Sequence, residues 1–139
     1  METQKENTTA LTRPFIDPNV TQAACNGAIH AVKDALYVLN GKWKLPLIVS
    51  LMDGPKRFNE IQRALGEITP KILSKELREL ELNEFVLRKV FSTVPVTVTY
   101  ELTPYSGSLS KVLEELRNWG TEHRERIVTS RRQSISVEK

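Results

Sequence analysis

The sequence has few of the residues on which disulfide, metal and histidine chemistry depend. Its 139 residues include one cysteine and two histidines. The lone Cys25 cannot form an intrachain disulfide or a cysteine-rich metal site, and such sparing use of cysteine is typical of a reducing cytoplasm. His30 and His123 are far apart in the sequence, with no cluster of carboxylates or cysteines beside them. We therefore expect no metal site and no catalytic histidine.

Other absences argue against an enzyme and against a membrane protein. The chain has no glycine-rich phosphate loop, no paired catalytic carboxylates and no nucleophile elbow, so we expect no catalytic residues and no cofactor. Its longest apolar stretch, Leu45–Met52, is interrupted by Pro46 and Ser50 and is far too short to span a bilayer. Residues 1–14 are polar and contain no apolar signal-peptide core, which favours a cytoplasmic protein with no membrane partner.

What the sequence does contain fits one globular domain with a mild positive charge. A chain of 139 residues is long enough to bury a core, and its contents of 40% hydrophobic and 27% charged residues are ordinary. The formal net charge of +3 permits an anionic partner without requiring one. The positions of the cations are therefore more informative than their sum.

The stretch Thr69–Glu84 carries the clearest helix signals. Thr69 is a good N-cap residue because its hydroxyl can accept a backbone N–H, and Pro70 is tolerated at the first helical position. These signals predict a helix from Pro70 to about Asn83. Four apolar residues at helical spacing are expected to form its core-facing stripe: Ile72, Leu73, Leu77 and Leu80.

A second face of this predicted helix is cationic. Lys71, Lys75 and Arg78 lie three and four residues apart, which places them together on the helix surface. With one face for a core and another that offers cations, the helix is expected to enter the major groove of DNA. A solvated charged face is the alternative, because three carboxylates on the same helix could pair locally with these cations: Glu76, Glu79 and Glu81.

Periodicity and turn signals predict three further helices around this one. The first is expected over Asn26–Leu39, and the second from Lys42 or Trp43 to Met52. The third is expected over Glu60–Leu65, with Asn59 as its N-cap.

Strand signals and a last helix complete the predicted chain. A short strand is expected at Lys56–Phe58, and a hairpin is expected from Phe85–Phe91 and Val96–Leu102. After Thr103-Pro104, a final long helix should carry a wide apolar stripe. The residues from Thr129 onward are expected to form a frayed polar tail.

This order of elements predicts the fold class. Three helices followed by a two-stranded wing form the winged helix-turn-helix, a mainly α fold with a small β-wing (α+β). The predicted helices at 60–65 and 70–83 are the helix-turn-helix itself. We expect a flexible N-terminal arm over residues 1–24 and the winged-helix domain with its dimerisation helices over residues 25–120. A helix extension and polar tail should follow over residues 121–139.

A set of linked motifs occurs in one order along the chain: Cys25, Gly41–Lys44, Asp53–Ile61, Ile68–Glu81, Val94–Thr103 and Trp119-Gly120. Together they resemble the HxlR-type bacterial transcriptional regulators, a MarR-like DNA-binding family. The resemblance covers roughly Cys25–Gly120. It departs at Asn26, where the family commonly has proline, and at Pro104–Gly107, where the family commonly has a charged pair.

The resemblance implies a homodimeric repressor or activator that binds double-stranded DNA, with the first and last helices forming the dimer. The apolar stripe of the last helix is wider than one small domain needs, although it could also pack on the chain's own first helix. A dimer would set two recognition helices about 34 Å apart, which predicts a near-palindromic operator. The expected interface residues are Ile29, Val32, Leu36, Leu109, Val112, Leu113, Leu116 and Trp119.

The predicted DNA contacts come from three places. In helix-turn-helix proteins the first turns of the second helix reach base edges, whereas many other contacts go to phosphate and only position the protein. Groups at the start of the preceding helix can hold a phosphate. A wing lies along the adjacent groove or backbone, and an ordinary solvent-exposed hairpin is its alternative. The expected base-reading residues are Thr69, Pro70, Lys71, Ser74 and Lys75, and the expected backbone contacts are Arg78, Lys56, Arg57, Asn59, Arg88, Lys89, Thr93 and Thr97.

Cys25 is the candidate redox sensor. The resemblance implies that a cysteine at this place can detect quinones, aldehydes or oxidants, through a thiolate that a helix N-terminus or nearby cations favour. Cys25 is expected directly before the first helix, and a buried inert thiol is the alternative. With one cysteine per chain, the product would be a disulfide between two chains or an adduct with a small thiol or electrophile.

Two other functions stay open on the sequence. The regulator could respond to a noncovalent small ligand at the dimer interface instead of through Cys25. The chain could also be a winged-helix protein-interaction module that does not bind DNA. Electrostatic binding to DNA weakens steeply with salt, so the salt dependence of DNA affinity distinguishes this last function.

Overall fold

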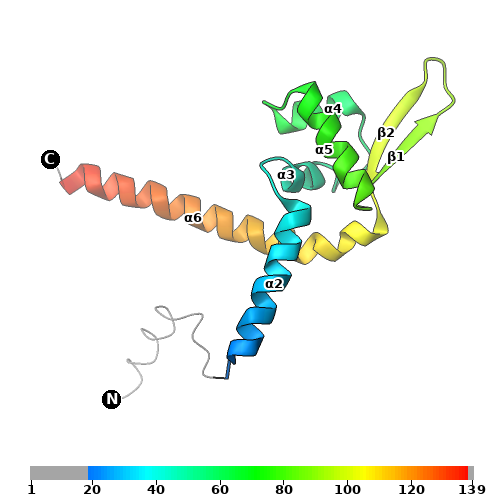
Figure 1. Cartoon of the computed structure of the whole chain (residues 1–139). Coiled ribbons are helices and arrows are strands. Elements are labelled where there is room, and N and C mark those ends of the chain that lie inside the picture. Colours follow the sequence, from blue (N-terminus) through cyan, green and yellow to red (C-terminus); the bar gives the residue numbers. More distant parts are fainter. Residues whose placement is uncertain (1–18, 138–139) are drawn as a thin grey trace. The chain divides into compact units, whose positions relative to one another are not determined.

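The computed structural model describes residues 19–137 of the chain (Figure 1). The described residues divide into two compact units, the first ending at Asn40 and the second beginning at Gly41. No helix within residues 19–137 combines the length and the apolar content that crossing a membrane requires. The described elements are α2 (Gln22–Leu39) in the first unit and, in the second, α3 (Lys44–Ser50), α4 (Phe58–Leu65), α5 (Pro70–Leu82), β1 (Val86–Phe91), β2 (Thr97–Leu102), the 3-10 helix η1 (Pro104–Leu109) and α6 (Ser110–Val137).

Helix α2 begins at Gln22, whereas the sequence predicted a start at Asn26. Its N-cap is Thr21, whose Oγ1 accepts the backbone N–H of Ala24 at 3.1 Å. A capped N–H stabilises the first turn, which favours a start at Gln22 over the predicted start at Asn26. Its end at Leu39 is as predicted.

The predicted N-terminal arm is only partly described. Residues 1–18 lie outside the described part of the chain. Residues 22–24 of the predicted arm belong to α2. No residue of α2 is buried within the chain.

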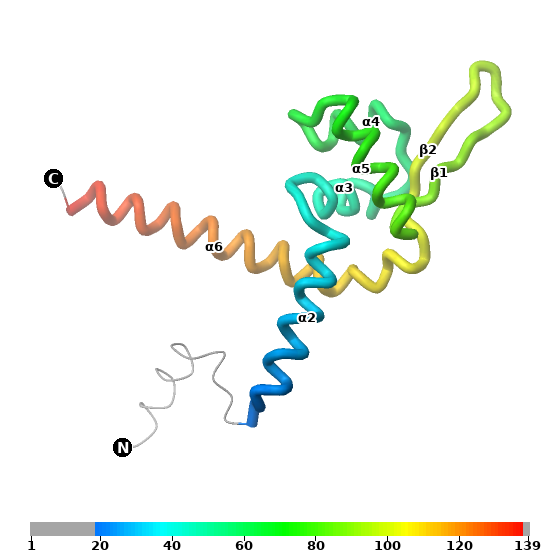
Figure 2. The backbone as a smooth tube through the Cα atoms, viewed as in Figure 1, coloured from blue at the N-terminus to red at the C-terminus, as the bar shows by residue number. Residues whose placement is uncertain are grey.

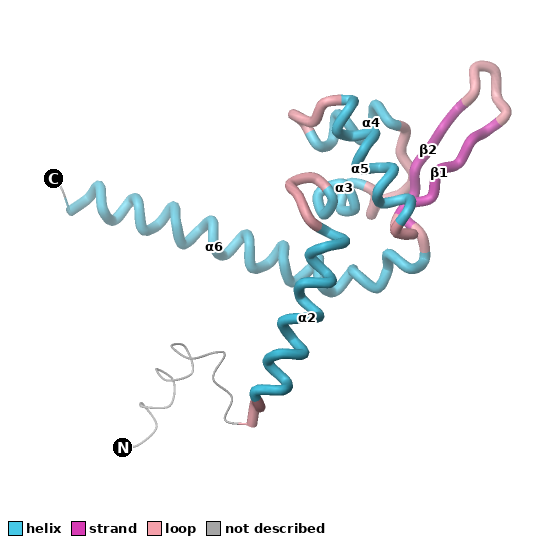
Figure 3. Tube along the Cα trace, in the orientation of Figure 1, coloured by secondary structure: helices cyan, strands magenta, loops and turns pink. Residues whose placement is uncertain are grey.

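Three helices and a two-stranded sheet form the winged helix of the second unit, which confirms the predicted fold class (Figure 3). Strands β1 and β2 pair antiparallel, with Val86 opposite Leu102 and Phe91 opposite Thr97. The apolar side chains that the strands and helices bury against one another are Leu47, Ile48, Leu51, Ile61, Ile68, Leu73, Leu77, Leu80, Phe85, Val86 and Leu113.

The segment that leads into α4 differs from its prediction in two ways. The short strand expected before α4 is reduced to a bridge, in which Lys56 and Tyr100 exchange backbone hydrogen bonds of 2.9 and 2.8 Å. The N-cap of α4 is Arg57 and not the predicted Asn59, which lies inside the helix. The carboxylate of Glu60 accepts the backbone N–H of Arg57 at 3.2 Å, so a side chain of the first turn satisfies the backbone N–H of the N-cap residue.

The turn between α4 and α5 is built from local signals that the sequence contains. Gly66 ends α4 with a φ of 84°, a left-handed conformation that glycine adopts without strain. The side-chain amide of Gln62 then donates to the carbonyl of Ile68 at 3.2 Å and holds the turn against α4. Thr69 caps α5 as predicted, because its Oγ1 accepts the N–H of Ile72 at 3.3 Å.

The second Thr-Pro pair begins the last helical segment. Thr103 accepts the N–H of Ser106 at 3.3 Å and donates to the carbonyl of Glu84 at 2.5 Å, which ties the start of η1 to the base of the wing. Helix α6 then runs from Ser110 to Val137 and extends beyond the winged helix of its unit (Figure 2). The residues from Thr129 onward are therefore helical up to Val137, and the prediction of a frayed tail there is wrong.

The core side of α5 can be tested with two leucines of the same helix. Leu73 is 0% exposed and Leu82 is 75% exposed. Leu73→Ala should lower the free energy of unfolding by about 2–5 kcal/mol, because it removes buried methyl groups and leaves a cavity. Leu82→Ala is the matched control and should change it little. Urea unfolding of both variants measures the difference, and equal losses would contradict this assignment of the core face.

Candidate nucleic-acid interface

Helix α5 presents a buried face and an outer face, as its spacing predicted. Leu73, Leu77 and Leu80 are buried in the core. Ile72 is 39% exposed, so its predicted place in the core stripe is wrong. Successive residues are turned by about 100° around a helix, and Ile72 is therefore directed to the flank of the stripe that the three leucines define.

The predicted cations of α5 lie on the outer face. Lys71, Lys75 and Arg78 are all exposed. Lys71 and Arg78 make no ion pair within the described part of the chain, while Nζ of Lys75 lies 4.0 Å from Oε1 of Glu79. The other residues predicted to contact bases are exposed as well: Thr69, Pro70 and Ser74. The predicted site residues of α5 and its N-cap are thus all accessible to solvent.

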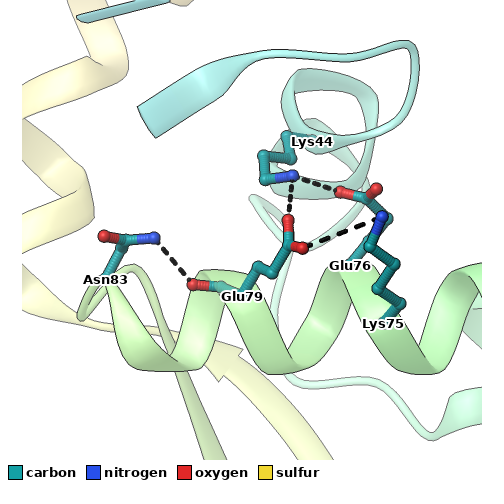
Figure 4. A network of polar contacts seen from close by, with 5 residues as sticks. All are labelled: Lys44, Lys75, Glu76, Glu79 and Asn83. Atoms are coloured by element: carbon teal, nitrogen blue, oxygen red, sulfur yellow. Dashed lines mark hydrogen bonds and ion pairs between the residues drawn. The ribbon is translucent and has the colours of Figure 1, made fainter. Parts of the chain in front are cut away.

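A buried lysine that the sequence interpretation missed lies behind this surface. Lys44, the first residue of α3, is 4% exposed. Its Nζ lies 2.7 Å from Oε2 of Glu76 and 2.5 Å from Oε2 of Glu79, both on α5 (Figure 4). The sequence did carry a signal, because Lys44 shares the helical spacing of the core residues Leu47 and Ile48.

The charges of this cluster are stabilised by one another. Burial by itself lowers the pKa of the Lys44 ammonium, but its hydrogen bonds to Glu76 and Glu79, together with their negative charges, raise that pKa above the usual 10.5. The hydrogen bond from Lys44 is also the main reason that the pKa of Glu79 lies below the usual 4.5, and the charge of Lys75 contributes least. Lys44 is therefore the principal partner of Glu79.

Lys56, a predicted phosphate contact, is engaged within the fold. Its ammonium pairs with the carboxylate of Asp53 and donates to the carbonyl of Ser50 at 2.6 Å. The hydrogen bond from Lys56 lowers the pKa of Asp53. Its neighbours Arg57 and Asn59 are exposed at the start of α4. Of the three predicted residues, Arg57 and Asn59 have side chains that are available on the surface, and Lys56 does not.

The two predicted cations of the wing do not form one patch. Neighbouring residues of a strand point to opposite faces, so Arg88 and Lys89 are directed apart. Nζ of Lys89 lies 2.6 Å from Oε1 of Glu101 on β2, whereas Arg88 makes no ion pair within the described residues. Arg88 is thus the wing cation whose charge is available to a partner.

The tip of the wing carries hydroxyls and apolar side chains. Oγ1 of Thr93 lies 2.8 Å from Oγ1 of Thr97 and donates to the carbonyl of Pro95 at 2.8 Å. Val94 and Val96 beside them are exposed. The tip therefore offers polar and apolar contacts without cations among the described residues.

The residues predicted for the dimer interface have different environments. Leu113 is 7% exposed and belongs to the core of its own unit, so little of its side chain is left for a second copy of the chain. Leu109 is half-buried. The remaining six are exposed on α2 or α6: Ile29, Val32, Leu36, Val112, Leu116 and Trp119.

A shallow apolar groove lies within the second unit. It has a volume of about 620 Å³ and is lined by residues of α3, α4 and α6 that include Leu45, Val49, Leu65 and Leu116. Trp43 also lines it, with Nζ of Lys42 at 4.9 Å from the indole ring. This groove is where a small apolar ligand could lie on the second unit.

Cys25 is exposed and lies inside α2. Its backbone N–H donates to the carbonyl of Thr21 at 3.0 Å, so it belongs to the first turn and does not precede the helix as predicted. The thiol of Cys25 is therefore not buried within this chain, in contrast to the alternative prediction. Within residues 19–137, no group of three or more histidine, cysteine, aspartate or glutamate residues is arranged to hold a metal ion.

Comparison with known proteins gives one consistent family. The model of the HxlR-like helix-turn-helix family matches residues 38–128. The uncharacterised HTH-type transcriptional regulator YdeP of Bacillus subtilis is 38% identical over 96 residues, which are 69% of this chain and 75% of that protein. The structure of the redox regulator HypR in its reduced form aligns with a TM-score of 0.67 at 37% identity, over 71% of this chain and 98% of HypR. Quinone-bound YodB from B. subtilis aligns with a TM-score of 0.57 at 36% identity, over 66% of this chain and 97% of YodB.

The pairing of Glu79 with Lys44 predicts a dependence of stability on pH. Because the pKa of Glu79 is lowered in the folded chain, its contribution to stability is complete above about pH 4.5 and is lost as the pH falls through the folded pKa. Glu79→Gln should therefore be less stable than the wild type at pH 6, and the difference should shrink towards pH 3. Urea unfolding at a series of pH values measures it.

Glu81→Gln is the matched control for this experiment. Glu81 is exposed on the same helix and makes no ion pair within the described residues. Its variant should keep the wild-type dependence on pH, including the part that Asp53 contributes. If the two glutamine variants follow the same curve, the ion pair with Lys44 does not stabilise Glu79.

Proposed function

Because this chain belongs to the HxlR-like helix-turn-helix family of transcriptional regulators, we propose that it binds a near-palindromic DNA operator as a homodimer. The observation that carries the proposal is the outer face of α5. Lys71, Lys75 and Arg78 are exposed on this face, and they follow the N-terminus of the helix that Thr69 caps. In helix-turn-helix proteins this helix lies in the major groove.

The contacts divide by their position along α5. Its first two turns read base edges through Thr69, Pro70, Lys71, Ser74 and Lys75, because the N-terminal part of a recognition helix enters the groove. Lysine suits guanine, and the serine and threonine hydroxyls suit several bases. Arg78 lies further along and contacts phosphate.

The backbone contacts are fewer than the sequence predicted. Arg57 and Asn59 at the start of α4 hold one phosphate, and Arg88 of the wing holds another. Lys56 and Lys89 contribute less, since each is already paired with a carboxylate of the chain. Thr93 and Thr97 bring the wing tip to the sugar-phosphate backbone through their hydroxyls.

Exposed apolar residues on α2 and α6 supply the dimer contacts. Ile29, Val32 and Leu36 of α2 lie three and four residues apart, and Val112, Leu116 and Trp119 of α6 have the same spacing. Apolar stripes on two helices are suited to a second copy of the chain. Two copies would present their α5 helices about 34 Å apart, the spacing of successive major grooves on one side of DNA.

Cys25 supplies the signal in this proposal. It is an exposed thiol in the first turn of a helix, where thiolates are favoured. The structures similar to this chain include oxidised HypR, diamide-treated YodB and quinone-bound YodB. A quinone would add to the sulfur of Cys25, and an oxidant would join two chains through it. Cys25 lies outside the residues 38–128 that match the family model, so this part rests on its exposure and position.

A second candidate signal is a noncovalent ligand. The apolar groove beside Trp43 offers about 620 Å³ for it. A response that does not need the thiol would favour this candidate.

The proposal is tested by selecting bound duplexes from random DNA with the full-length chain. We expect an enriched sequence with two half-sites one helical turn apart and an affinity that falls steeply with salt. A flat salt response or no enriched sequence would instead favour a protein-interaction module. Lys71→Ala should relax the preference at one base pair of each half-site, at a cost of about 1–3 kcal/mol per half-site.

Two wing variants serve as controls for the selected duplex. Arg88→Ala should weaken binding to all sequences alike. Because each protomer of the homodimer loses one phosphate contact, the slope of log affinity against log salt should fall by about 1.8. Lys89→Ala should reduce the slope less, because Glu101 already pairs with Lys89. If Lys71→Ala and Arg88→Ala have the same effect, the division between base-reading and positioning contacts is wrong.

The sensor is tested with Cys25→Ser. Benzoquinone or diamide should release the wild-type chain from the selected duplex, whereas the serine variant should stay bound because it lacks a nucleophilic thiol. Mass spectrometry of the treated wild type should find the adduct, or the disulfide between chains, at Cys25. Release of the serine variant at the same reagent concentration would exclude the thiol as the sensor.

A further inference from the structure

Glu79 lies between two lysines of different elements. Its Oε2 is 2.5 Å from Nζ of Lys44 on α3, and its Oε1 is 4.0 Å from Nζ of Lys75 on its own helix (Figure 4). The side chain of Lys44 is 5% exposed, whereas that of Lys75 is 69% exposed. The buried lysine therefore holds the carboxylate more closely than the exposed lysine does.

The geometry of α5 makes the two lysines competitors for this carboxylate. At about 100° per residue, Glu79 is directed between Glu76 on the buried side and Lys75 on the outer side. A lysine that precedes a glutamate by four residues can pair with it, although the reverse order is better. Without Lys44, Lys75 would be the nearest cation to Glu79 among the described residues.

This competition matters for a polyanionic partner. An ammonium that pairs with a neighbouring carboxylate is less available to phosphates or base edges, and the carboxylate itself repels phosphate. Of the three glutamates on α5, Lys44 binds both Glu76 and Glu79. The outer face is thus kept cationic by a residue that cannot reach DNA itself.

We infer that Lys44 is a positioning residue for DNA binding: by holding Glu79 against α3, it leaves the ammonium of Lys75 available to the DNA. This inference rests on the proposed DNA-binding function and extends it to a residue outside the interface. A merely structural ion pair would fasten α3 to α5 without changing what Lys75 contributes to DNA affinity.

A double-mutant cycle on the full-length chain separates these two roles. The probe is a duplex selected from random DNA by the wild type. In the wild type, Lys75→Ala should weaken binding about tenfold. The second background is Lys44→Met/Glu76→Gln, which removes Lys44 without leaving the buried charge of Glu76 unpaired. In this background the carboxylate of Glu79 pairs with Lys75, so DNA binding should already be about tenfold weaker than in the wild type. Adding Lys75→Ala to this background should weaken binding by less than about twofold further.

Rescue at Glu79 completes the cycle. Adding Glu79→Gln to the Lys44→Met/Glu76→Gln background should restore both the affinity and the roughly tenfold effect of Lys75→Ala, because no carboxylate competes for the lysine. A tenfold effect of Lys75→Ala in both backgrounds would overturn the inference while leaving DNA binding intact. A wild type that binds no duplex in a salt-dependent way would overturn the proposed function, and the inference with it.

A second comparison applies if circular dichroism shows that the background without Lys44 does not fold. With Lys44 present, the effect of Lys75→Ala should stay within about twofold whether residue 79 is glutamate or glutamine, since Lys44 already holds Glu79. If Glu79→Gln instead raises the effect of Lys75→Ala several-fold, Lys75 is the partner of Glu79 in the native chain and the inference is wrong.

Discussion

The ion pairs of Lys44 fix how the recognition helix lies on the rest of the winged helix. Lys44 is surrounded by core residues of α3, and its only carboxylate partners within the described chain are Glu76 and Glu79. Removing Lys44 alone costs about 3–5 kcal/mol, because the buried charge of Glu76 is left without compensation in a low-dielectric interior. Apolar packing alone tolerates small shifts of one helix over another, whereas this cluster is satisfied in one register. The direction of the outer face of α5 therefore depends on α3.

Sequence reasoning recovered the elements whose signals are local. Thr69-Pro70 begins α5, Gly66 ends α4 and the β-branched alternation after Val96 forms β2, because caps, glycine conformations and period-two patterns act within a few residues. The prediction for the C-terminal residues was wrong, because their polar composition was taken to indicate a frayed tail. The residues after Thr129 are polar and yet helical to Val137, since arginine, glutamine and serine tolerate a helix that needs no buried face.

The candidate site was predictable in position but less so in charge. Helical spacing located Lys71, Lys75 and Arg78 correctly on an exposed face of α5. The pairings that occupy other lysines join residues that tertiary structure brings together: Lys44 lies 32 and 35 residues from its partners, and Lys89 meets Glu101 only through the strand register. Counting cations along the sequence therefore overestimates the charge that a partner can use, because it cannot tell which of them are already neutralised.

The bridge between Lys56 and Tyr100 has a mechanical consequence. It joins the wing to the residue immediately before the N-cap of α4, so a tilt of the hairpin is transmitted through one peptide to the helix-turn-helix. In the proposed complex with DNA, the wing and the helix-turn-helix therefore move together, and the duplex adapts where its grooves do not match them. The energy of that adaptation differs among base sequences, so preference can arise at base pairs that no side chain contacts.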